Sequence, residues 1–422
     1  MAFNLKYIEE NRDELIDSIE KRFLPFTGEE VDKLLSLYDK IKQQRTELDK
    51  LRQRRNEIEL ARGREAEKRE EAKALRIEIS KREKELQKNE DEADKLFLKM
   101  PNLLDRSVPI AKDESGNLEI KKVGDIPKKD FEVKSAEELA ISKGMLDLDS
   151  AAKISGSRFI FLKGKLVQLA LALELYSLNK LIDKGYTAVL PPLLMKEEIY
   201  KGIAHMSTFE DALYRVTGRE ETDESTRFLI STTEHPLIAM YSGQVLEEKD
   251  TPVKLIGESP AFRKEAGAHG KDTKGMFRLH QFDQTEQIAI CKPEDSSKMQ
   301  EEFLENEEEM LKELGLPYRV MLLSSGDMGV RDFKQYDLEA FMPFQGKYRE
   351  VMSNDNCTDW ISRRSNIKIA EKGGERVYAH TVDATGLPVQ RIMKAILEIH
   401  QQEDGTVKLP QVLVKYTGFS EL

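Results

Sequence analysis

Two runs of apolar residues at heptad spacing, between about residues 28 and 100, constrain the fold of this chain most strongly. The first run contains Leu34, Leu37, Ile41, Leu48, Leu51 and Ile58, with Gln44 and Arg55 as polar exceptions. The second contains Leu75, Ile79, Leu86, Ala93, Leu96 and Met100, with Arg82 and Asn89 as polar exceptions. Each apolar stripe is too narrow to be buried except against a similar stripe, and Gly63 lies in the polar segment between them. We therefore predict an antiparallel helical hairpin that forms an arm.

The predicted arm is long and locally basic. A helix of this length extends about 45 Å at 1.5 Å per residue. Between Ile41 and Glu90, 16 lysines and arginines stand against 12 aspartates and glutamates, although the whole chain has a formal net charge of −11. The arm is either an ordinary solvated coiled coil, which charge alone favours, or a surface that follows a nucleic-acid backbone.

Composition narrows the class of protein. A chain of 422 residues is long enough for two domains. We expect no membrane span because no window approaches 18 uninterrupted apolar residues, and the N-terminal sequence has no secretory pattern. Cys291 and Cys357 are the only cysteines, and the six histidines lack metal-ligand spacing, so we expect a cytoplasmic protein with no zinc site.

After the arm, the chain changes to mixed helices and strands. Prolines at 101, 109 and 127 predict a linker, which places an N-terminal domain at 1–110 and a second domain at 111–422. Strand-like runs cluster without regular helical crossovers, which favours an α+β domain with an antiparallel sheet. We predict helices near 160–184, 298–315 and 389–402, and a last strand at 406–416.

A basic segment, residues 262–282, lies between two predicted strands. It reads "FRKEAGAHGKDTKGMFRLHQF", and we expect a hairpin with a mobile, glycine-containing tip. Arg263 and Arg278 would stand near the strand ends, where guanidinium groups can bind phosphate oxygens. Considered alone, the segment could equally be a basic surface hairpin without a ligand.

This segment resembles the second motif of class II aminoacyl-tRNA synthetases in the form found in the seryl-tRNA synthetase family. Four other segments resemble that family in order and spacing: "KGYTAVLPPLL", the dimer-interface motif; "STTEHPL", the amino-acid loop; "YREVMSNDNCTDWISRR"; and "TGLPVQRIMKAILE", the third motif. With the predicted arm, the resemblance covers essentially the whole chain. It implies a homodimer with a class II catalytic domain and a tRNA-binding arm.

The resemblance also implies roles for individual residues. For ATP binding it implies Arg263, Glu265, Arg278, Phe282, Glu350, Ser353 and Arg391, with the three arginines as catalytic residues and Glu350 and Ser353 as ligands of Mg²⁺. For serine binding it implies Thr232, Glu234, Arg263, Glu286, Asp383 and Thr385. The implied reaction forms seryl-adenylate from serine and ATP and then transfers serine to tRNA(Ser), with tRNA(Sec) as a second candidate acceptor.

These residue types suit that chemistry. A carboxylate oxygen attacks the α-phosphorus and pyrophosphate leaves, so fixed positive charge is needed on oxygens that gain negative charge. Arginine stays protonated and binds phosphate through two nitrogens, and Mg²⁺ prefers oxygen ligands. No covalent enzyme nucleophile is required.

One residue departs from the family pattern. Where the family has a sequence close to "HTLN(G/S)(S/T)", this chain has "HTVDATG", so Asp383 replaces an asparagine. An ionised Asp only accepts hydrogen bonds, whereas Asn also donates them. Two alternatives therefore stay open: a paralogue that loads a different amino acid onto a carrier protein, and a tRNA-binding paralogue with a weak catalytic site.

Overall fold

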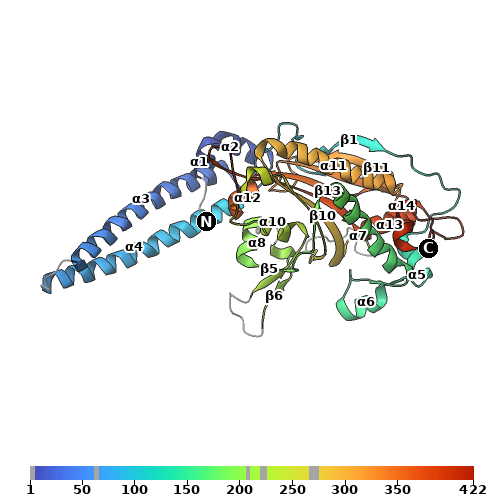
Figure 1. The fold of residues 1–422 in the computed structure, drawn as a ribbon, viewed down its shortest axis with the longest axis horizontal. Helices are drawn as coiled ribbons and strands as arrows, with labels where there is room; N and C mark the ends of the chain where they lie inside the picture. Colours follow the sequence, from blue (N-terminus) through green and yellow to red (C-terminus); the bar gives the residue numbers. More distant parts are fainter. Residues whose placement is uncertain (1–4, 61–65, 206–209, 219–225, 266–274) are drawn as a thin grey trace. The chain divides into compact units, whose positions relative to one another are not determined.

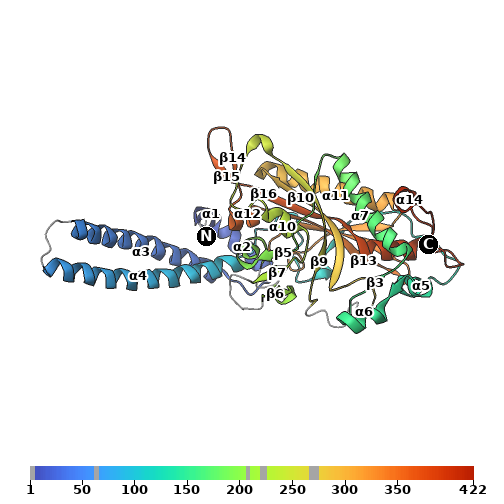
Figure 2. The ribbon, with the colours of Figure 1, turned by 60° about the horizontal axis from the view of Figure 1, so that its bottom comes forward.

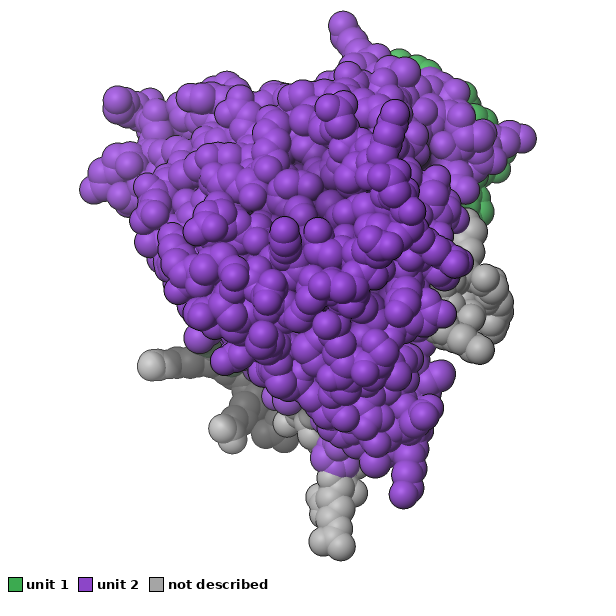
Figure 3. All heavy atoms as spheres, turned by 90° about the vertical axis from the view of Figure 1, so that its right-hand side faces the viewer, with its two compact units in different colours: residues 1–103 green, residues 104–422 purple. Residues whose placement is uncertain are grey.

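The computed structural model describes residues 5–60, 66–205, 210–218, 226–265 and 275–422. The chain divides into two compact units, residues 1–103 and residues 104–422, which Figure 3 colours separately. None of the described helices combines the length and the apolar character that crossing a membrane requires.

The first unit is helical, and its two long helices form the predicted arm (Figure 1). Its elements are α1 (Leu5–Glu10), α2 (Arg12–Lys21), α3 (Gly28–Leu60) and α4 (Ala66–Lys99). The heptad positions Leu34, Ile41 and Leu48 are buried, and Ile79 and Ala93 of α4 are buried as well. Apolar periodicity therefore predicted the arm correctly.

Polar residues of the two apolar stripes pair with each other across the arm. Asn89 is buried, and its Nδ2 donates to Gln44 Oε1 at 2.9 Å. Lys40 Nζ donates to Asn89 Oδ1 at 3.4 Å. A buried polar pair of this kind fixes the register of a coiled coil, because any slip would leave the amide without a partner.

The charges of the arm fall into two groups. Five arginines pair with glutamates of the opposite helix: Arg45–Glu90, Arg52–Glu83, Arg54–Glu71, Arg76–Glu59 and Arg82–Glu47. Six lysines are exposed and make no ion pair with any residue that the structure describes: Lys42, Lys50, Lys73, Lys81, Lys84 and Lys88. These arginines thus connect the two helices, as Lys33 does through Glu92, and the six lysines supply positive charge that remains accessible.

The second unit is built on an eight-stranded sheet with the order β1-β11-β12-β13-β16-β10-β9-β4. Figure 2 labels its strands β9, β10, β13 and β16. The bounds are β1 (Leu118–Val123), β4 (Thr187–Val189), β9 (Val253–Phe262), β10 (Gln281–Cys291), β11 (Tyr318–Leu322), β12 (Lys334–Met342), β13 (Lys347–Thr358) and β16 (His380–Pro388). All neighbours in this sheet pair antiparallel except the edge pair β4 and β9, which is parallel. The prediction of an α+β unit with an antiparallel sheet is confirmed.

Helices and short strands surround this sheet. The helices are α5 (Ala136–Ser142), α6 (Leu148–Ser155), α7 (Lys165–Asp183), α8 (Glu197–Ile203), α10 (Glu234–Ala239), α11 (Ser296–Glu313), α12 (Trp360–Ser365), α13 (Val389–Ile399) and α14 (Gln411–Thr417). The short strands are β2 (Leu146–Asp147), β3 (Phe161–Leu162), β5 (Leu194–Lys196), β6 (Arg215–Val216), β7 (Arg227–Leu229), β8 (Val245–Glu247), β14 (Lys368–Ala370) and β15 (Arg376–Tyr378).

Two expectations from the sequence were wrong in detail. The last predicted strand, 406–416, is replaced by isolated bridges and helix α14, which buries Leu413 in the main apolar core. The predicted linker contains strand β1, which pairs with β11 at the edge of the sheet. In both segments the structure is decided by contacts with residues that are distant in the sequence, and local apolar periodicity does not reveal such contacts.

The central strands have one face covered by α11 and one open face. On the covered face Asn306 of α11 donates to Gln287 Oε1 at 2.7 Å, and Asn354 donates to Glu307 of α11 at 3.0 Å. Phe303 of α11 packs in one apolar cluster with Ala384 of β16. Because side chains alternate along a strand, the neighbours of these residues point to the opposite face. Those neighbours are Glu286, Ser353, Asp355, Asp383 and Thr385.

Candidate active site

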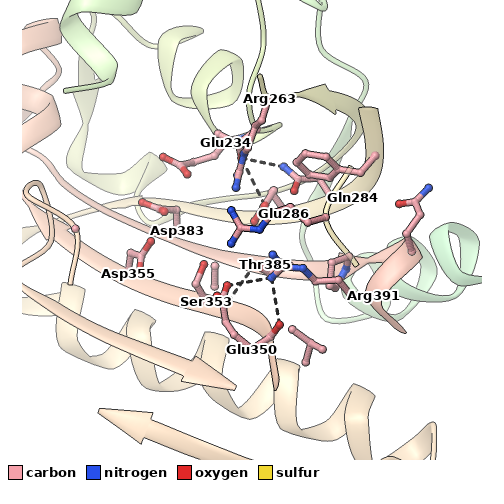
Figure 4. A pocket seen from close by; sticks show the side chains of 18 of the residues that line it. Glu234, Arg263, Gln284, Glu286, Glu350, Ser353, Asp355, Asp383, Thr385 and Arg391 are labelled. Atoms are coloured by element: carbon pink, nitrogen blue, oxygen red, sulfur yellow. Dashed lines mark hydrogen bonds and ion pairs between the residues drawn. The ribbon is translucent and has the colours of Figure 1, made fainter. Parts of the chain in front are cut away.

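A polar pocket of about 280 Å³ lies on the open face of the central strands. All twelve residues that the resemblance implied line it: Thr232, Glu234, Arg263, Glu265, Arg278, Phe282, Glu286, Glu350, Ser353, Asp383, Thr385 and Arg391. Figure 4 shows Glu234, Asp355 and Asp383 toward one end and Glu350 and Arg391 toward the other. Segments far apart in the sequence thus contribute to a single site.

At one end of the pocket, arginines from separate elements come together. Arg263 follows the last residue of β9, and its Nε donates to the Ser231 carbonyl at 3.0 Å. Its guanidinium carbon lies 5.2 Å from the centre of the Phe282 ring. Burial and the charge of Arg391 lower the pKa of Arg263. A buried guanidinium beside a second one is a favourable place for an anionic ligand, because the ligand would offset the cost of burying the positive charge.

Arg278 lies in the bend before β10, since β10 begins at Gln281 and not near Phe277 as the sequence predicted. Arg278 Nη1 donates to Glu265 Oε2 at 2.6 Å. The Arg278 Nε is buried and has no hydrogen-bond partner among the described residues. The expected mobile tip, 266–274, lies outside the described residues.

Arg391, in the first turn of α13, is held beside Glu350. Its Nη1 donates to Glu350 Oε1 at 3.0 Å, and its guanidinium carbon lies 4.9 Å from the centre of the Phe277 ring. Burial alone would raise the pKa of Glu350, but the positive charges of Arg391, Arg263 and Arg278 together outweigh burial and lower the pKa overall. Glu350 is therefore ionised at neutral pH.

A bulge in β13 brings Glu350 and Ser353 to the same face. Glu350 lies opposite Glu339, whereas Met352 lies opposite Leu338, so one extra residue interrupts the alternation. A carboxylate and a hydroxyl on one face are oxygen donors that suit Mg²⁺ together with phosphate oxygens and water. The described residues contain no group of three or more His, Cys, Asp or Glu arranged to hold a metal by themselves.

In the middle of the pocket, Glu286, Thr385 and Ser353 form a row across three strands. Glu286 pairs with Thr385 in the sheet register, and Ser353 N donates to Thr385 Oγ1 at 3.2 Å. Thr232 Oγ1 donates to Glu286 Oε1 at 3.5 Å, the outer limit of a hydrogen bond. Burial, reinforced by Glu234, raises the pKa of Glu286 to about 8. Glu286 is thus a neutral acid near pH 7 and can both donate and accept.

The opposite end of the pocket contains residues that the sequence did not indicate. Arg331 lies between β11 and β12, and its Nη2 donates to Asp383 Oδ1 at 2.8 Å and to Asp355 Oδ2 at 3.1 Å. It also forms an ion pair with Glu234 through Nη1. Asp383 was noted as unusual, and a buried Asp requires a cationic partner. In the sequence, this requirement was the only indication that a cation lies beside Asp383, and it does not identify Arg331 as that cation.

Cys357 lies beneath this end of the pocket as a buried thiol. Its Sγ lies 3.3 Å from Asp332 Oδ1 and 3.4 Å from Asp383 Oδ2, and its single S–H can donate to either carboxyl group. Burial, with the charge of Asp383, raises the pKa of Cys357 well above its usual value. A thiol that stays protonated is unsuited to nucleophilic chemistry.

Comparisons with known proteins agree with this architecture. The family model for the seryl-tRNA synthetase N-terminal domain matches residues 3–104, and the model for the tRNA synthetase class II core domain (G, H, P, S and T) matches residues 214–400. A serine–tRNA ligase of Methanocella arvoryzae is 42% identical over 82% of this chain and 80% of its own. Another, from Korarchaeum cryptofilum, is 39% identical over 99% of this chain and 95% of its own.

Solved structures give the same result. A crystal structure of seryl-tRNA synthetase from Pyrococcus horikoshii complexed with ATP has a TM-score of 0.88 and 37% sequence identity. The match covers 99% of this chain and 98% of that chain. A cytoplasmic serine–tRNA ligase from Naegleria fowleri in complex with AMP has a TM-score of 0.83 and 31% identity, over 99% of this chain and 97% of that one.

The raised pKa of Glu286 predicts a pH-dependent stability. From the usual value of 4.5 up to about 8, the unfolded chain loses this proton while the folded chain keeps it, so stability falls as the pH rises. The slope from this group is at most about 1.4 kcal/mol per pH unit. We expect Glu286→Gln to gain stability relative to the unmodified protein between pH 5 and pH 8, as measured by urea unfolding at both pH values.

The matched control is Glu305→Gln, on the exposed side of α11. We expect it to follow the unmodified protein at both pH values. Parallel profiles for Glu286→Gln and the unmodified protein would show that Glu286 is ionised in the folded state.

Proposed function

Because this chain belongs to the seryl-tRNA synthetase family, we propose that its pocket activates serine with ATP and transfers it to tRNA(Ser) bound by the arm. In the first step a serine carboxylate oxygen bonds to the α-phosphorus while the bond to the bridging oxygen breaks and pyrophosphate leaves. In the second, the terminal ribose hydroxyl of the tRNA attacks the carbonyl carbon and AMP leaves.

One observation carries this proposal: Arg263, Arg278 and Arg391 lie together at one end of the pocket. Beside them lies the row of Glu286, Thr385 and Ser353, which can form hydrogen bonds with a hydroxyl group. Arg263 uses Nε for the Ser231 carbonyl, which leaves its two terminal nitrogens for oxygens of the α-phosphate. Arg278 and Arg391 bind the outer phosphates, and Phe282 lies against the adenine. Fixed guanidinium groups stabilise the charge that develops as pyrophosphate leaves.

The metal site of the proposal uses Glu350 and Ser353. Mg²⁺, held there with phosphate oxygens and water, would supply charge neutralisation for the phosphates. The ion pair between Glu350 and Arg391 keeps the carboxylate ionised and oriented toward this end of the pocket. Glu265 acts through its ion pair with Arg278, which positions that guanidinium.

Serine selection follows from the row of Glu286, Thr385 and Ser353. A neutral Glu286 can exchange hydrogen bonds with the serine hydroxyl, and Thr385 is its neighbour across the sheet. Alanine is rejected because it would leave these buried groups unpaired, and threonine because its extra methyl group crowds the row. Thr232 and Glu234 bind the serine ammonium.

Two alternatives are weaker on specific grounds. A carrier-protein ligase does not need a long basic arm, and this chain has one. A tRNA-binding paralogue with a weak site does not need the three arginines and Glu350, all of which line the pocket here. We place the reaction in the cytoplasm, where buried free thiols such as Cys291 and Cys357 persist.

We also propose a homodimer formed through α7. Val167, Leu171, Leu175 and Ile182 recur at steps that place them on one face of this helix, and all four are exposed in the single chain. An exposed apolar stripe of this kind is typical of a subunit interface. The partner proposed for it is a second copy of the chain, as the family resemblance implies.

The activation step is tested by amino-acid-dependent ATP–pyrophosphate exchange with serine, threonine, alanine, glycine and cysteine. We expect serine to exceed alanine in kcat/KM by about 10⁴-fold, since the site is built to bind a hydroxyl. Arg391→Ala should lower the rate by about 10²–10³-fold, because it removes a group that stabilises transition-state charge. Arg319→Ala, outside the pocket, is the control. An absence of exchange with serine contradicts the proposal.

The arm is tested by replacing residues 45–85 with a short Gly-Ser link, which leaves the apolar cluster around Leu34, Ile41 and Phe97 in place. We expect adenylate formation to be unchanged and charging of tRNA(Ser) to fall by about 10³-fold, since phosphate contacts dominate such affinities. tRNA(Sec) is assayed in parallel. Retained charging of both tRNAs would show that the arm does not bind them.

The dimer is tested with Leu171→Glu and Leu175→Glu. A charge in the middle of an apolar interface is costly, so we expect both variants to sediment as monomers in analytical ultracentrifugation. Phe344→Glu, which changes a residue of similar exposure away from α7, should sediment like the unmodified protein. A monomeric unmodified protein would contradict this assignment.

A further inference from the structure

The pocket contains two rows of polar residues. The row of Glu286, Thr385 and Ser353 is the one proposed to bind the serine hydroxyl, and beyond it lies a second row that contains Asp355 and Asp383. Asp383 lies two residues before Thr385 on β16, and Asp355 lies two residues after Ser353 on β13. Two residues along a strand correspond to about 6.6 Å. This row lies farther from Glu350 and Arg391, at the end of the pocket where Figure 4 shows Asp355 and Asp383. An amino acid whose side chain continued past Glu286 and Thr385 in this direction would meet the second row.

The second row by itself is electrostatically unfavourable. Asp355 and Asp383 are direct cross-strand partners, and their side chains are 9% and 4% exposed. Like charges directly opposite each other in a sheet repel, and burial increases the cost. Accordingly, burial raises the pKa of both carboxyl groups well above the usual value. A cation is needed to stabilise them.

Arg331 supplies that cation and joins three elements in doing so. One nitrogen, Nη2, contacts Asp383 of β16 and Asp355 of β13, and Glu234 at the start of α10 accepts from the same guanidinium. Its Nε lies 3.2 Å from Asp332 Oδ1. The Arg331 side chain is 15% exposed and lines the pocket. It therefore lies at the Asp355–Asp383 end of the pocket, held there by carboxyl groups from separate elements.

The acidic row still has capacity to accept after Arg331 is counted. Asp355 Oδ1 is buried and has no hydrogen-bond partner among the described residues. Four carboxyl groups, those of Glu234, Asp332, Asp355 and Asp383, surround one guanidinium. If the guanidinium were removed, the remaining space would be lined by acceptors and would suit a side-chain ammonium.

We propose, on the basis of the proposed function, that Arg331 is a specificity-determining residue that closes the amino-acid site against longer side chains and, through its charge, against cationic ones. Asp383 acts together with Arg331: where the family has Asn, this chain has an Asp that accepts a hydrogen bond from the Arg331 guanidinium. The Arg331–Asp383 pair keeps the site limited to a side chain as short as that of serine.

Three amino acids test the proposal by ATP–pyrophosphate exchange. Serine has the short side chain, L-homoserine is one methylene longer and neutral, and L-2,4-diaminobutyrate has a side chain of the same length as homoserine but carries an ammonium. For Arg331→Ala we expect the kcat/KM ratio of diaminobutyrate to serine to rise at least tenfold, and that of homoserine to serine to rise less. All three amino acids share the α-ammonium, so an altered Glu234 alone changes all three equally.

Two variants act as controls. Arg331→Lys keeps a cation among the carboxylates and should retain the preference for serine, whereas Arg319→Ala removes an arginine paired with Glu119 and Glu339 outside the pocket and should not alter the ratio. If Arg331→Ala does not fold, Arg331→Gln, which keeps hydrogen-bond donors, replaces it in the same comparison.

The outcomes separate this inference from the proposed function. A diaminobutyrate-to-serine ratio within twofold of the unmodified protein, in any folded variant without a cation at position 331, overturns the inference. If the unmodified protein activates an amino acid other than serine, the proposed function fails. The role of Arg331 is then tested with that amino acid as the reference.

Discussion

The two-residue alternation of side chains along β10, β16 and β13 is the constraint on which the rest of the catalytic unit depends. It sends Gln287, Asn354 and Ala384 toward α11, where amide pairs and apolar contacts are buried. It sends Glu286, Asp383 and Thr385 to the open face, where they line the pocket. A shift of one residue in the register would exchange the two sets, burying carboxyl groups against α11. The packing of one sheet face against α11 therefore determines which side chains line the pocket on the other face.

The bulge in β13 interrupts this alternation at one end of the site, and the pairing of β10 with β16 shifts register as well, between Thr285 and Glu286. Without the extra residue, Glu350 and Ser353, three positions apart, would point to opposite faces. With it, a carboxylate and a hydroxyl share the end of the pocket where Arg391 lies. The irregularity places two oxygen donors beside the phosphate-binding arginines while the rest of the strand remains paired.

Sequence reasoning succeeded where the information is local or follows a family pattern. Heptad spacing predicted α3 and α4, because an apolar stripe requires a partner stripe. The resemblance selected twelve residues that the structure brings into one pocket, although their individual roles remain proposals. It failed at 406–416, where apolar alternation suggested a strand and the chain forms α14. It also missed Arg331, because a residue between two strands gives no local sign of which carboxylates it will meet.

On the arm, the residues that hold the two helices in register differ from the lysines that carry accessible positive charge, so the two sets can change independently. Cross-helix arginine–glutamate pairs and the Gln44–Asn89 pair hold the two helices in register, whereas the exposed lysines contribute nothing to that register. Lysines can therefore be lost, gained or moved along the rod with little effect on its folding, since surface substitutions of this kind change stability only slightly. The contact surface of the arm can diverge while its framework is retained, so one fold can adapt to differently shaped RNA partners.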